Sequence, residues 1–314
     1  MAPRKIIIDT DPGQDDAFAI LFALGSPSEL EVVGVTTVGG NVPLRLTALN
    51  AQKVVELAGR PDIPVFAGCP GPMVRPLMTA EYVHGETGLD GANLPDPVMP
   101  LQTQHGVNWM VDTIMAAPEG EITVCTLGPM TNLAMAMTME PRIIPRIREV
   151  VLMGGGFFEG GNATPAAEFN IYVDPHAAHK VFACGVPVTM AGIDCTYTAQ
   201  MTPEWLQSLR ATGSRAAREA ANLADFYRKY GSHKFPTEAR PIHDACVTGY
   251  LLKPEIYESK QCYVTVDISS PVTIGMTVVD WWHVTGEKRN CNVLRRIDPA
   301  PFFNLMLERI SALP

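Results

Sequence analysis

The chain has 314 residues, 46% of them hydrophobic and 18% charged, so it can bury a large core. Its formal net charge of -9 argues against nucleic acid or an anionic membrane surface as a partner. A small neutral ligand fits this charge better than a polyanion does.

The seven cysteines form no C-x-x-C pair, and their odd number does not indicate a disulfide framework. We therefore expect reduced thiols and a cytoplasmic protein. The apolar segment at the N-terminus is too short for a signal peptide. No apolar run approaches the roughly 20 residues of a membrane helix, so we expect no membrane partner.

Up to Asp194, short runs rich in Val and Ile alternate with longer amphipathic segments, which is typical of βαβ units around a parallel sheet. The strands are predicted over residues 5–9, 30–38, 63–68, 121–128, 148–155 and 186–192. The helices between them are predicted over residues 15–25, 43–59, 105–117, 131–141 and 174–185. This part of the chain is expected to be doubly wound.

After Asp194 the pattern is mainly helical. Helices are predicted over residues 202–211, in the Arg- and Ala-rich stretch up to Tyr230, and over 243–254 and 299–313, with strands over 262–268 and 275–282. No linker rich in Ser or Gly separates the two parts. We predict a single domain over residues 1–314, of the α/β class. It would have an open, mostly parallel Rossmann-like sheet flanked by helices, with C-terminal helical and strand additions.

Two predicted loops are much longer than the 2 to 6 residues that are usual in compact α/β proteins. One runs from Cys69 to about Gln104, and the other is the segment "GGGFFEGGNATPAAEFN" after the fifth strand. In open α/β sheets, ligands bind outside the carboxyl ends of the strands, where both loops should emerge.

The stretch "DTDPGQDDAFA" crowds four aspartates around a Pro-Gly turn between the first strand and the first helix. One aspartate there is enough to cap a helix, and like charges in close proximity make one another harder to ionise. A hard cation resolves this repulsion, because Ca²⁺ and Mg²⁺ prefer oxygen ligands. An EF-hand loop is excluded, because its sixth position would be Gln14 and its twelfth Ile20.

Other strand ends add polar groups at the same expected edge. Asn41 follows the second strand in "VGGN", and the carbonyl of Leu127 follows the fourth in "TLGPMTN". His243 and Asp244 open a late helix in "PIHDAC". Because adjacent residues there point in different directions, Asp244 could reach a metal while His243 faces a substrate.

In that order along the chain, the segments "DTDPGQDDAFA", "VGGN", "HGETGLDG", "LGPMTN", "VVLMGGG", "GNATPAAEFNIYVDP", "HDA" and "GMTVVD" resemble the signature blocks of the inosine/uridine-preferring nucleoside hydrolases. The resemblance spans nearly the whole chain. It implies a Ca²⁺-dependent enzyme of nucleoside salvage. Such an enzyme cleaves the N-glycosidic bond of ribonucleosides with water, through an oxocarbenium-like transition state, and it works as a homodimer or homotetramer.

Carried over position by position, the resemblance assigns a role to each matching residue. The metal ligands would be Asp11, Asp16, the Leu127 carbonyl and Asp244; the groups that hold ribose or lie near the substrate would be Asp15, Asn41, His84, Asn162, Glu168 and Asn170. Asp11 would act as general base on a metal-bound water, and His243, titrating near neutrality, would protonate the departing base. Asp9 is left with a supporting role.

The purine-specific branch of the family has a tryptophan where this chain has His243. We therefore expect uridine and cytidine, with inosine in a broader range, as substrates. Tyr227, Tyr230 and His233 are candidates for the border of the base site. Two alternatives stay open at this level: a Ca²⁺-dependent ribose or nucleoside sensor without turnover, and an unrelated Mg²⁺ phosphohydrolase.

Overall fold

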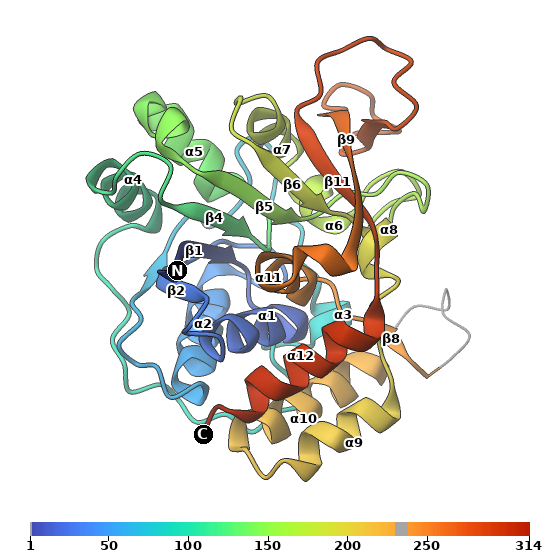
Figure 1. The fold of residues 1–314 in the computed structure, drawn as a ribbon. Coiled ribbons are helices and arrows are strands. Elements are labelled where there is room, and N and C mark those ends of the chain that lie inside the picture. The colour runs from blue at the N-terminus through green and yellow to red at the C-terminus, as the bar shows by residue number, and fades with distance from the viewer. Residues whose placement is uncertain (1, 230–237) are drawn as a thin grey trace.

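The structure is a computed structural model of the chain, and it describes residues 2–229 and 238–314. Nine strands form one sheet in the order β10-β9-β11-β6-β5-β4-β1-β2-β3 (Figure 1). They are β1 (Arg4–Thr10), β2 (Leu30–Thr37), β3 (Val65–Ala67), β4 (Thr123–Thr126), β5 (Glu149–Met153), β6 (Val188–Ala191), β9 (Tyr257–Val266), β10 (Thr277–Asp280) and β11 (Cys291–Ile297). β7 (Gln200–Met201) and β8 (Arg240–Pro241) pair separately.

The first six strands lie in the order 3-2-1-4-5-6 and are parallel to one another, as in a Rossmann fold. This confirms the predicted fold class. Between β1 and β4 the direction of winding reverses, and such a switch point opens a crevice at the carboxyl ends of the strands. The sheet continues through β11, which is parallel to β6, to the antiparallel strands β9 and β10.

Each helix and strand predicted from the sequence overlaps one in the structure. The helices are α1 (Gln14–Leu24), α2 (Leu44–Leu57), α3 (Glu81–His84), α4 (Gly106–Ala116), α5 (Thr131–Met139), α6 (Phe169–Val173), α7 (Pro175–Phe182), α8 (Ile193–Thr196), α9 (Pro203–Ala211), α10 (Arg215–Lys229), α11 (Ala245–Leu252) and α12 (Pro299–Ser311), with 3-10 turns η1 (Pro141–Arg146) and η2 (Pro254–Ile256). The sequence analysis missed β11. Its "CNVLRRI" carries two arginines and an asparagine and lacks the clear alternation of a half-buried strand.

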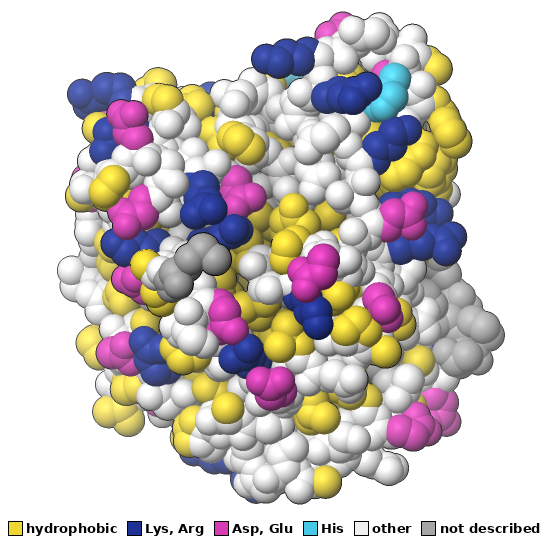
Figure 2. All heavy atoms as spheres, viewed as in Figure 1, with side chains coloured by type: hydrophobic (Ala, Val, Ile, Leu, Met, Phe, Trp, Pro, Cys, Tyr) yellow, Lys and Arg dark blue, Asp and Glu magenta, His cyan; other side chains and the backbone are white. Residues whose placement is uncertain are grey.

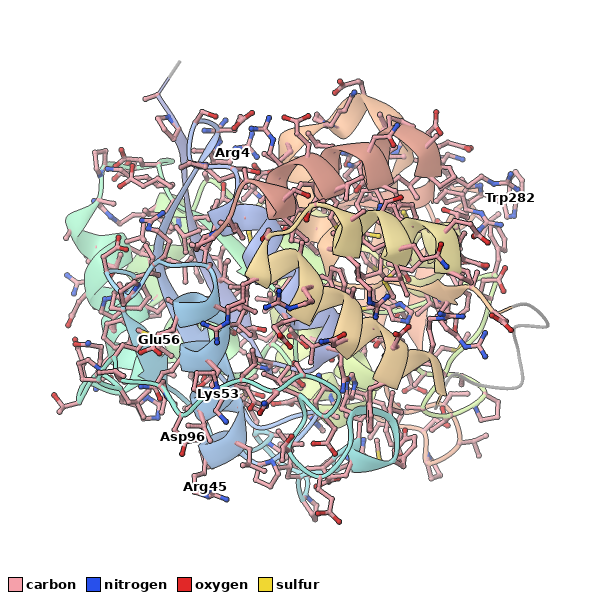
Figure 3. The ribbon with its side chains drawn as sticks, turned by 90° about the horizontal axis from the view of Figure 1, so that it is seen from below. Arg4, Arg45, Lys53, Glu56, Asp96 and Trp282 are labelled. Atoms are coloured by element: carbon pink, nitrogen blue, oxygen red, sulfur yellow. The ribbon has the colours of Figure 1, made fainter. Side chains whose placement is uncertain are left out.

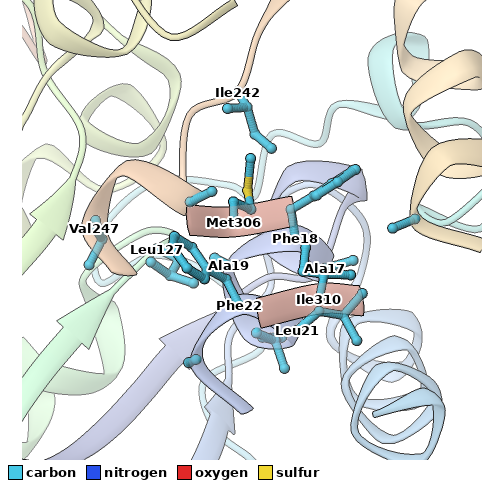
Figure 4. Close-up of a cluster of buried hydrophobic side chains, with 14 of the residues drawn as sticks. Ala17, Phe18, Ala19, Leu21, Phe22, Leu127, Ile242, Val247, Met306 and Ile310 are labelled. Atoms are coloured by element: carbon cyan, nitrogen blue, oxygen red, sulfur yellow. The ribbon is translucent and has the colours of Figure 1, made fainter. Parts of the chain in front are cut away.

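The helix α1 is the centre of one hydrophobic core. Every residue of α1 is buried, because α2 and α10–α12 surround the helix on the sides that the sheet leaves open. Figure 4 shows Phe18 and Phe22 of α1 beside Met306 of α12. On the other face of the sheet, α4, α5 and α7 cover a second core. The packing of α1 fixes the direction in which its first turn points.

The long loop that begins at Cys69 is fastened to α2 at its far end. Lys53 Nζ lies 3.4 Å from Asp96 Oδ1, and the carboxylate of Glu56 accepts a 2.6 Å hydrogen bond from the amide of Val98 (Figure 3). Nearer its middle, Asn50 Nδ2 donates to the Thr87 carbonyl at 2.8 Å. These contacts hold the part of the loop that carries His84 against the body of the protein.

No helix among the described residues is long and apolar enough to cross a membrane. On the face seen in Figure 2, acidic and basic side chains are interspersed.

Phe302 of α12 offers a test of this packing. Its side chain is fully buried and meets Phe22 edge to face, with ring centroids 6.2 Å apart. We predict that Phe302→Ala lowers the free energy of unfolding by about 3–5 kcal/mol, because it leaves a cavity against α1. Guanidinium denaturation measures the loss. Met139→Ala, at a side chain 56% exposed, is the control. Equal midpoints for the two variants would contradict the assigned role of α12.

Candidate functional site

Four aspartates from three segments meet at the carboxyl end of β1. Asp11 follows the strand directly, Asp15 and Asp16 lie in the first turn of α1, and Asp244 precedes α11. Carboxylate oxygens of Asp15, Asp16 and Asp244 all lie within 4.8 Å of one another. All four side chains are at most 7% exposed. The sequence analysis had brought these residues together from their places at strand and helix ends, and the structure agrees.

Burial and mutual repulsion act together on these carboxyl groups. Burial raises the pKa of Asp15 to about 7, and the neighbouring Asp16 raises it too. The pKa of Asp11 and that of Asp244 are raised well above the usual range, again first by burial and then by the other aspartates. In the protein alone the cluster therefore holds its negative charge poorly at neutral pH.

The carboxylate of Asp11 is walled in by two glycines from neighbouring strand ends. A Cβ atom at Gly40 would overlap Asp11 Oδ2, and one at Gly128 would overlap Asp11 Oδ1. Asp11 Oδ2 accepts a 2.7 Å hydrogen bond from the amide of Asn41. Asp11 Oδ1 is buried and has no hydrogen-bond partner among the described residues. Only glycine at positions 40 and 128 leaves room for the Asp11 carboxylate, and Asp11 Oδ1 is left for a ligand.

Asn41 and Asp16 tie the second strand to the cluster. Asn41 Nδ2 donates to the Asp11 carbonyl at 3.1 Å and to Asp16 Oδ2 at 3.2 Å. Asp16 Oδ2 also accepts from the Gly13 amide at 2.9 Å, and Asp16 Oδ1 accepts from the Thr10 hydroxyl. Asp16 is thus held in one orientation by the turn that it closes.

A divalent cation fits this donor set. The cluster offers only oxygen atoms, and in the part of the chain that the structure describes Asp11 Oδ1 has no hydrogen-bond partner. The Leu127 carbonyl, which the sequence analysis also placed here, borders the same cavity as Asp15 and Asp244 and accepts a 2.6 Å hydrogen bond from Asn170 Nδ2. A carbonyl oxygen has two lone pairs, so this bond leaves one for a cation.

Above the cluster lies a cavity of about 350 Å³. It is lined by these residues predicted from the sequence: Asp15, Asn41, His84, Leu127, Asn162, Glu168, Asn170, His243 and Asp244. Asp11 and Asp16 are not among the lining residues and are at most 1% exposed. All the candidate residues are thus brought to one place.

The second long loop supplies one wall of the cavity. Glu168 caps the short helix α6, because its carboxylate accepts hydrogen bonds from the amides of Asn170 at 3.0 Å and Ile171 at 3.3 Å. The same carboxylate accepts from the Gly155 amide at 2.9 Å. Burial raises the pKa of Glu168 to about 7. Asn162 Oδ1 accepts from the Phe169 amide at 2.9 Å. The loop is therefore shaped by the same polar side chains that it presents to the cavity.

His243 and His84 both border the cavity. Burial lowers the pKa of His243 to about 4, so the expectation that it titrates near neutrality is wrong, and its ring is neutral at pH 7. Burial lowers the pKa of His84 to about 3. The sequence does not show that both histidines are buried, and they are less than 10% exposed.

Several lining residues were not predicted: Tyr82, Phe169, Tyr197 and Arg240. Tyr82 and Phe169 are close neighbours of predicted residues, but no local pattern distinguishes them. Tyr227, named as a candidate, lines the cavity and stacks on His84, with centroids 5.9 Å apart. Tyr230 and His233 lie outside the described residues.

Asp9 has the supporting place that was expected of it. Its Oδ1 accepts hydrogen bonds from Thr36 Oγ1 at 2.6 Å and Asn132 Nδ2 at 2.7 Å. These bonds join β1 to β2 and to α5 just below the cluster.

Comparison with known proteins agrees with this geometry. The model of the family described as inosine-uridine preferring nucleoside hydrolase matches residues 6–304. The pyrimidine-specific ribonucleoside hydrolase RihA of Citrobacter koseri is 43% identical over 98% of this chain and 97% of its own. The inosine-uridine preferring nucleoside hydrolase of Crithidia fasciculata is 40% identical over 99% of this chain and 98% of its own.

Among solved structures, the purine-preferring ribonucleoside hydrolase from Gardnerella vaginalis matches with a TM-score of 0.91 and 30% identity, covering 98% of each chain. These likenesses extend over the full sheet and over every segment that contributes to the cavity. They confirm the resemblance found in the sequence. The chain belongs to the inosine-uridine preferring nucleoside hydrolase family and is an enzyme that hydrolyses ribonucleosides.

Proposed function

We propose that the enzyme uses Ca²⁺ to hydrolyse the N-glycosidic bond of uridine and cytidine, and of inosine in a broader range, to ribose and free base. The observation that carries this proposal is the all-oxygen cluster of buried carboxylates beneath the cavity, where Asp11 Oδ1 has no hydrogen-bond partner among residues 2–229 and 238–314. Asp11, Asp16, the Leu127 carbonyl and Asp244 would hold the ion.

The pyrimidine preference is supported by two observations. The relative from Citrobacter koseri is named as pyrimidine-specific and the one from Crithidia fasciculata as inosine-uridine preferring. This chain also places His243, and no tryptophan, directly before Asp244. A cavity of about 350 Å³ is at the small end of the range for ligand sites, which suits a single nucleoside.

When bound, Ca²⁺ would offset the charge of the aspartates, hold sugar hydroxyl oxygens and lower the pKa of a water. The protein groups then have separate tasks. Asp15 and Asn41 on one side, with Asn162, Glu168 and Asn170 on the other, would orient the ribose. Asp11 would take a proton from the attacking water. The surrounding carboxylates would stabilise the positive charge that develops on the sugar ring.

His243 would act on the leaving group, as a donor to the departing base. It lines the cavity beside Asp244, and its ring packs edge to face against Tyr197, with centroids 5.8 Å apart. His84 and Tyr227, stacked on each other, would border the substrate.

We also propose that the whole chain acts as one nucleoside hydrolase domain, in the cytoplasm, as a homodimer or homotetramer. All seven cysteines are free. Large apolar side chains are exposed around β10 and the segment after it, with Trp282 at 73% and Val284 at 82%, and contiguous apolar surface of this kind is often covered by another subunit.

Metal removal is the first test. We predict that a chelator abolishes the release of reducing sugar from uridine and that added Ca²⁺ restores it, because the carboxylates otherwise protonate or repel one another. Ca²⁺ at about 100 times its dissociation constant should stabilise the fold by about 2.7 kcal/mol. A colorimetric sugar assay and thermal unfolding measure the two effects. Full activity in chelator would contradict the proposal.

Asp244→Asn tests metal binding independently of the stability of the fold. We predict that the variant loses the rise in unfolding temperature on Ca²⁺ addition, while its unfolding temperature in chelator is at least that of the unmodified protein, because one repelling charge is gone. Asp9→Asn is the matched control: it is buried on β1 outside the cluster, and it should keep the rise. A normal Ca²⁺ response in Asp244→Asn would overturn the ligand assignment.

His243→Ala tests the leaving-group role. We predict that kcat on uridine falls by about 10²–10³, which is typical when a hydrogen-bond donor to a developing negative charge is lost. Hydrolysis of 4-nitrophenyl riboside, whose leaving group needs no such help, should fall far less. Steady-state kinetics on both substrates measure this, and equal losses would count against the role.

A further inference from the structure

Both histidines of the cavity are held at Nδ1 by a buried side chain. His84 Nδ1 lies 2.6 Å from Gln14 Oε1, and His243 Nδ1 lies 2.7 Å from Thr196 Oγ1. The two partners differ chemically. An amide oxygen only accepts hydrogen bonds, whereas a hydroxyl both donates and accepts.

The hydrogen bonds of Gln14 fix the proton on His84. Gln14 Nε2 donates to the carbonyls of His84 at 2.9 Å and Asp90 at 3.2 Å. Because both carbonyls can only accept, the amide cannot be turned around, and Oε1 must face the ring. His84 therefore carries its proton on Nδ1, and Nε2 of the neutral ring is an acceptor.

The hydroxyl of Thr196 imposes the opposite arrangement on His243. Thr196 ends α8 and is fully buried, and within residues 2–229 and 238–314 its hydroxyl has no hydrogen-bond partner other than His243 Nδ1. If Nδ1 carried the proton, the hydroxyl proton would be buried without an acceptor, at a cost of about 1–3 kcal/mol. Thr196 therefore donates to Nδ1, and the ring proton is on Nε2.

We propose that Gln14 and Thr196 are positioning residues that set opposite tautomers on the two cavity histidines, so that His84 presents an acceptor and His243 a donor. This inference rests on the proposed function, in which His243 acts on the departing base. As the C–N bond breaks, its electron pair goes to the base, and His243 Nε2–H donates a hydrogen bond to the base anion. The attacking water gives hydroxide to the sugar and its other proton to Asp11. The base anion takes a proton from a solvent water, and the hydroxide left behind takes the proton from Asp11, which restores the carboxylate.

The tautomers can be observed without any turnover. Nitrogen NMR of the Ca²⁺-loaded protein labelled with ¹⁵N-histidine reports which ring nitrogen carries the proton, and His84→Gln and His243→Gln assign the signals. We expect Nδ1–H on His84 and Nε2–H on His243. Thr196→Val should turn the His243 signals into those of a tautomer mixture, and Thr196→Ser should keep them. A proton on Nδ1 of His243 in the unmodified protein would overturn the inference.

Kinetics test the consequence. Thr196→Val should lower kcat on uridine about tenfold, as expected from one lost hydrogen bond, with little change in KM. The rate on 4-nitrophenyl riboside should stay within about twofold, and Thr196→Ser should restore the rate on uridine. Thr47→Val, at a buried threonine of α2 bonded to the Val38 carbonyl, is the control for a general packing loss and should leave the ratio of the two rates unchanged.

The outcomes separate the two proposals. Equal losses on both substrates in Thr196→Val would leave the residue with a structural role only and overturn its positioning role. If no ribonucleoside is hydrolysed even with Ca²⁺, the proposed function fails. The tautomer assignment is still decided by the spectra in that case.

Discussion

The buried negative charge beneath the cavity is the constraint on which the rest of the site depends. Four carboxyl groups occupy the end of one strand and the helix starts beside it, and they are at most 7% exposed. Burial raises the pKa of each, and repulsion from neighbouring aspartates raises the pKa of Asp11, Asp15 and Asp244 further. A cluster of this kind is costly unless a cation balances it. Gly40 and Gly128 leave space for Asp11, and Asn41 donates hydrogen bonds to the carboxylates of Asp11 and Asp16. The fold thus brings the four aspartates of the cluster together without any ligand.

Most of the groups above the acidic cluster lie on loops, and hydrogen bonds to the rest of the protein hold these loops in place. Glu168 shapes its own loop through three backbone amides, and the segment with His84 is fastened to α2 and to Gln14. Orientation of the reactants is a large part of catalysis, and in these loops the side chains that make the turns also face the cavity. Gln14 beside His84 and Thr196 beside His243 orient the two cavity histidines in the same way, through buried hydrogen bonds.

Periodicity and strand-end position were enough to predict most of the fold and the acidic cluster. The pattern of residues 30–38 indicates a strand, and that of residues 15–25 indicates a helix. Parallel strands bring their carboxyl ends to one edge of the sheet, which placed the polar residues that follow them in one region. The strand Cys291–Ile297 was not predictable, because burial between β6 and β9 overrides a mixed local pattern. The contact of Thr196 with His243, 47 residues away, and the depth that keeps both histidines neutral exist only in the tertiary structure.

The place of β11 in the sheet has a consequence for how the chain is made. β9 and β10 precede it in sequence, yet both connect to the main sheet only through β11, which lies between β9 and β6. Until the residues of β11 have been synthesised, the edge of β6 lacks this partner strand, and β9 and β10 have no strand through which to join the sheet. An open apolar edge is a hazard for association with other chains. β11 therefore covers the edge of β6 and joins β9 and β10 to the sheet in one step.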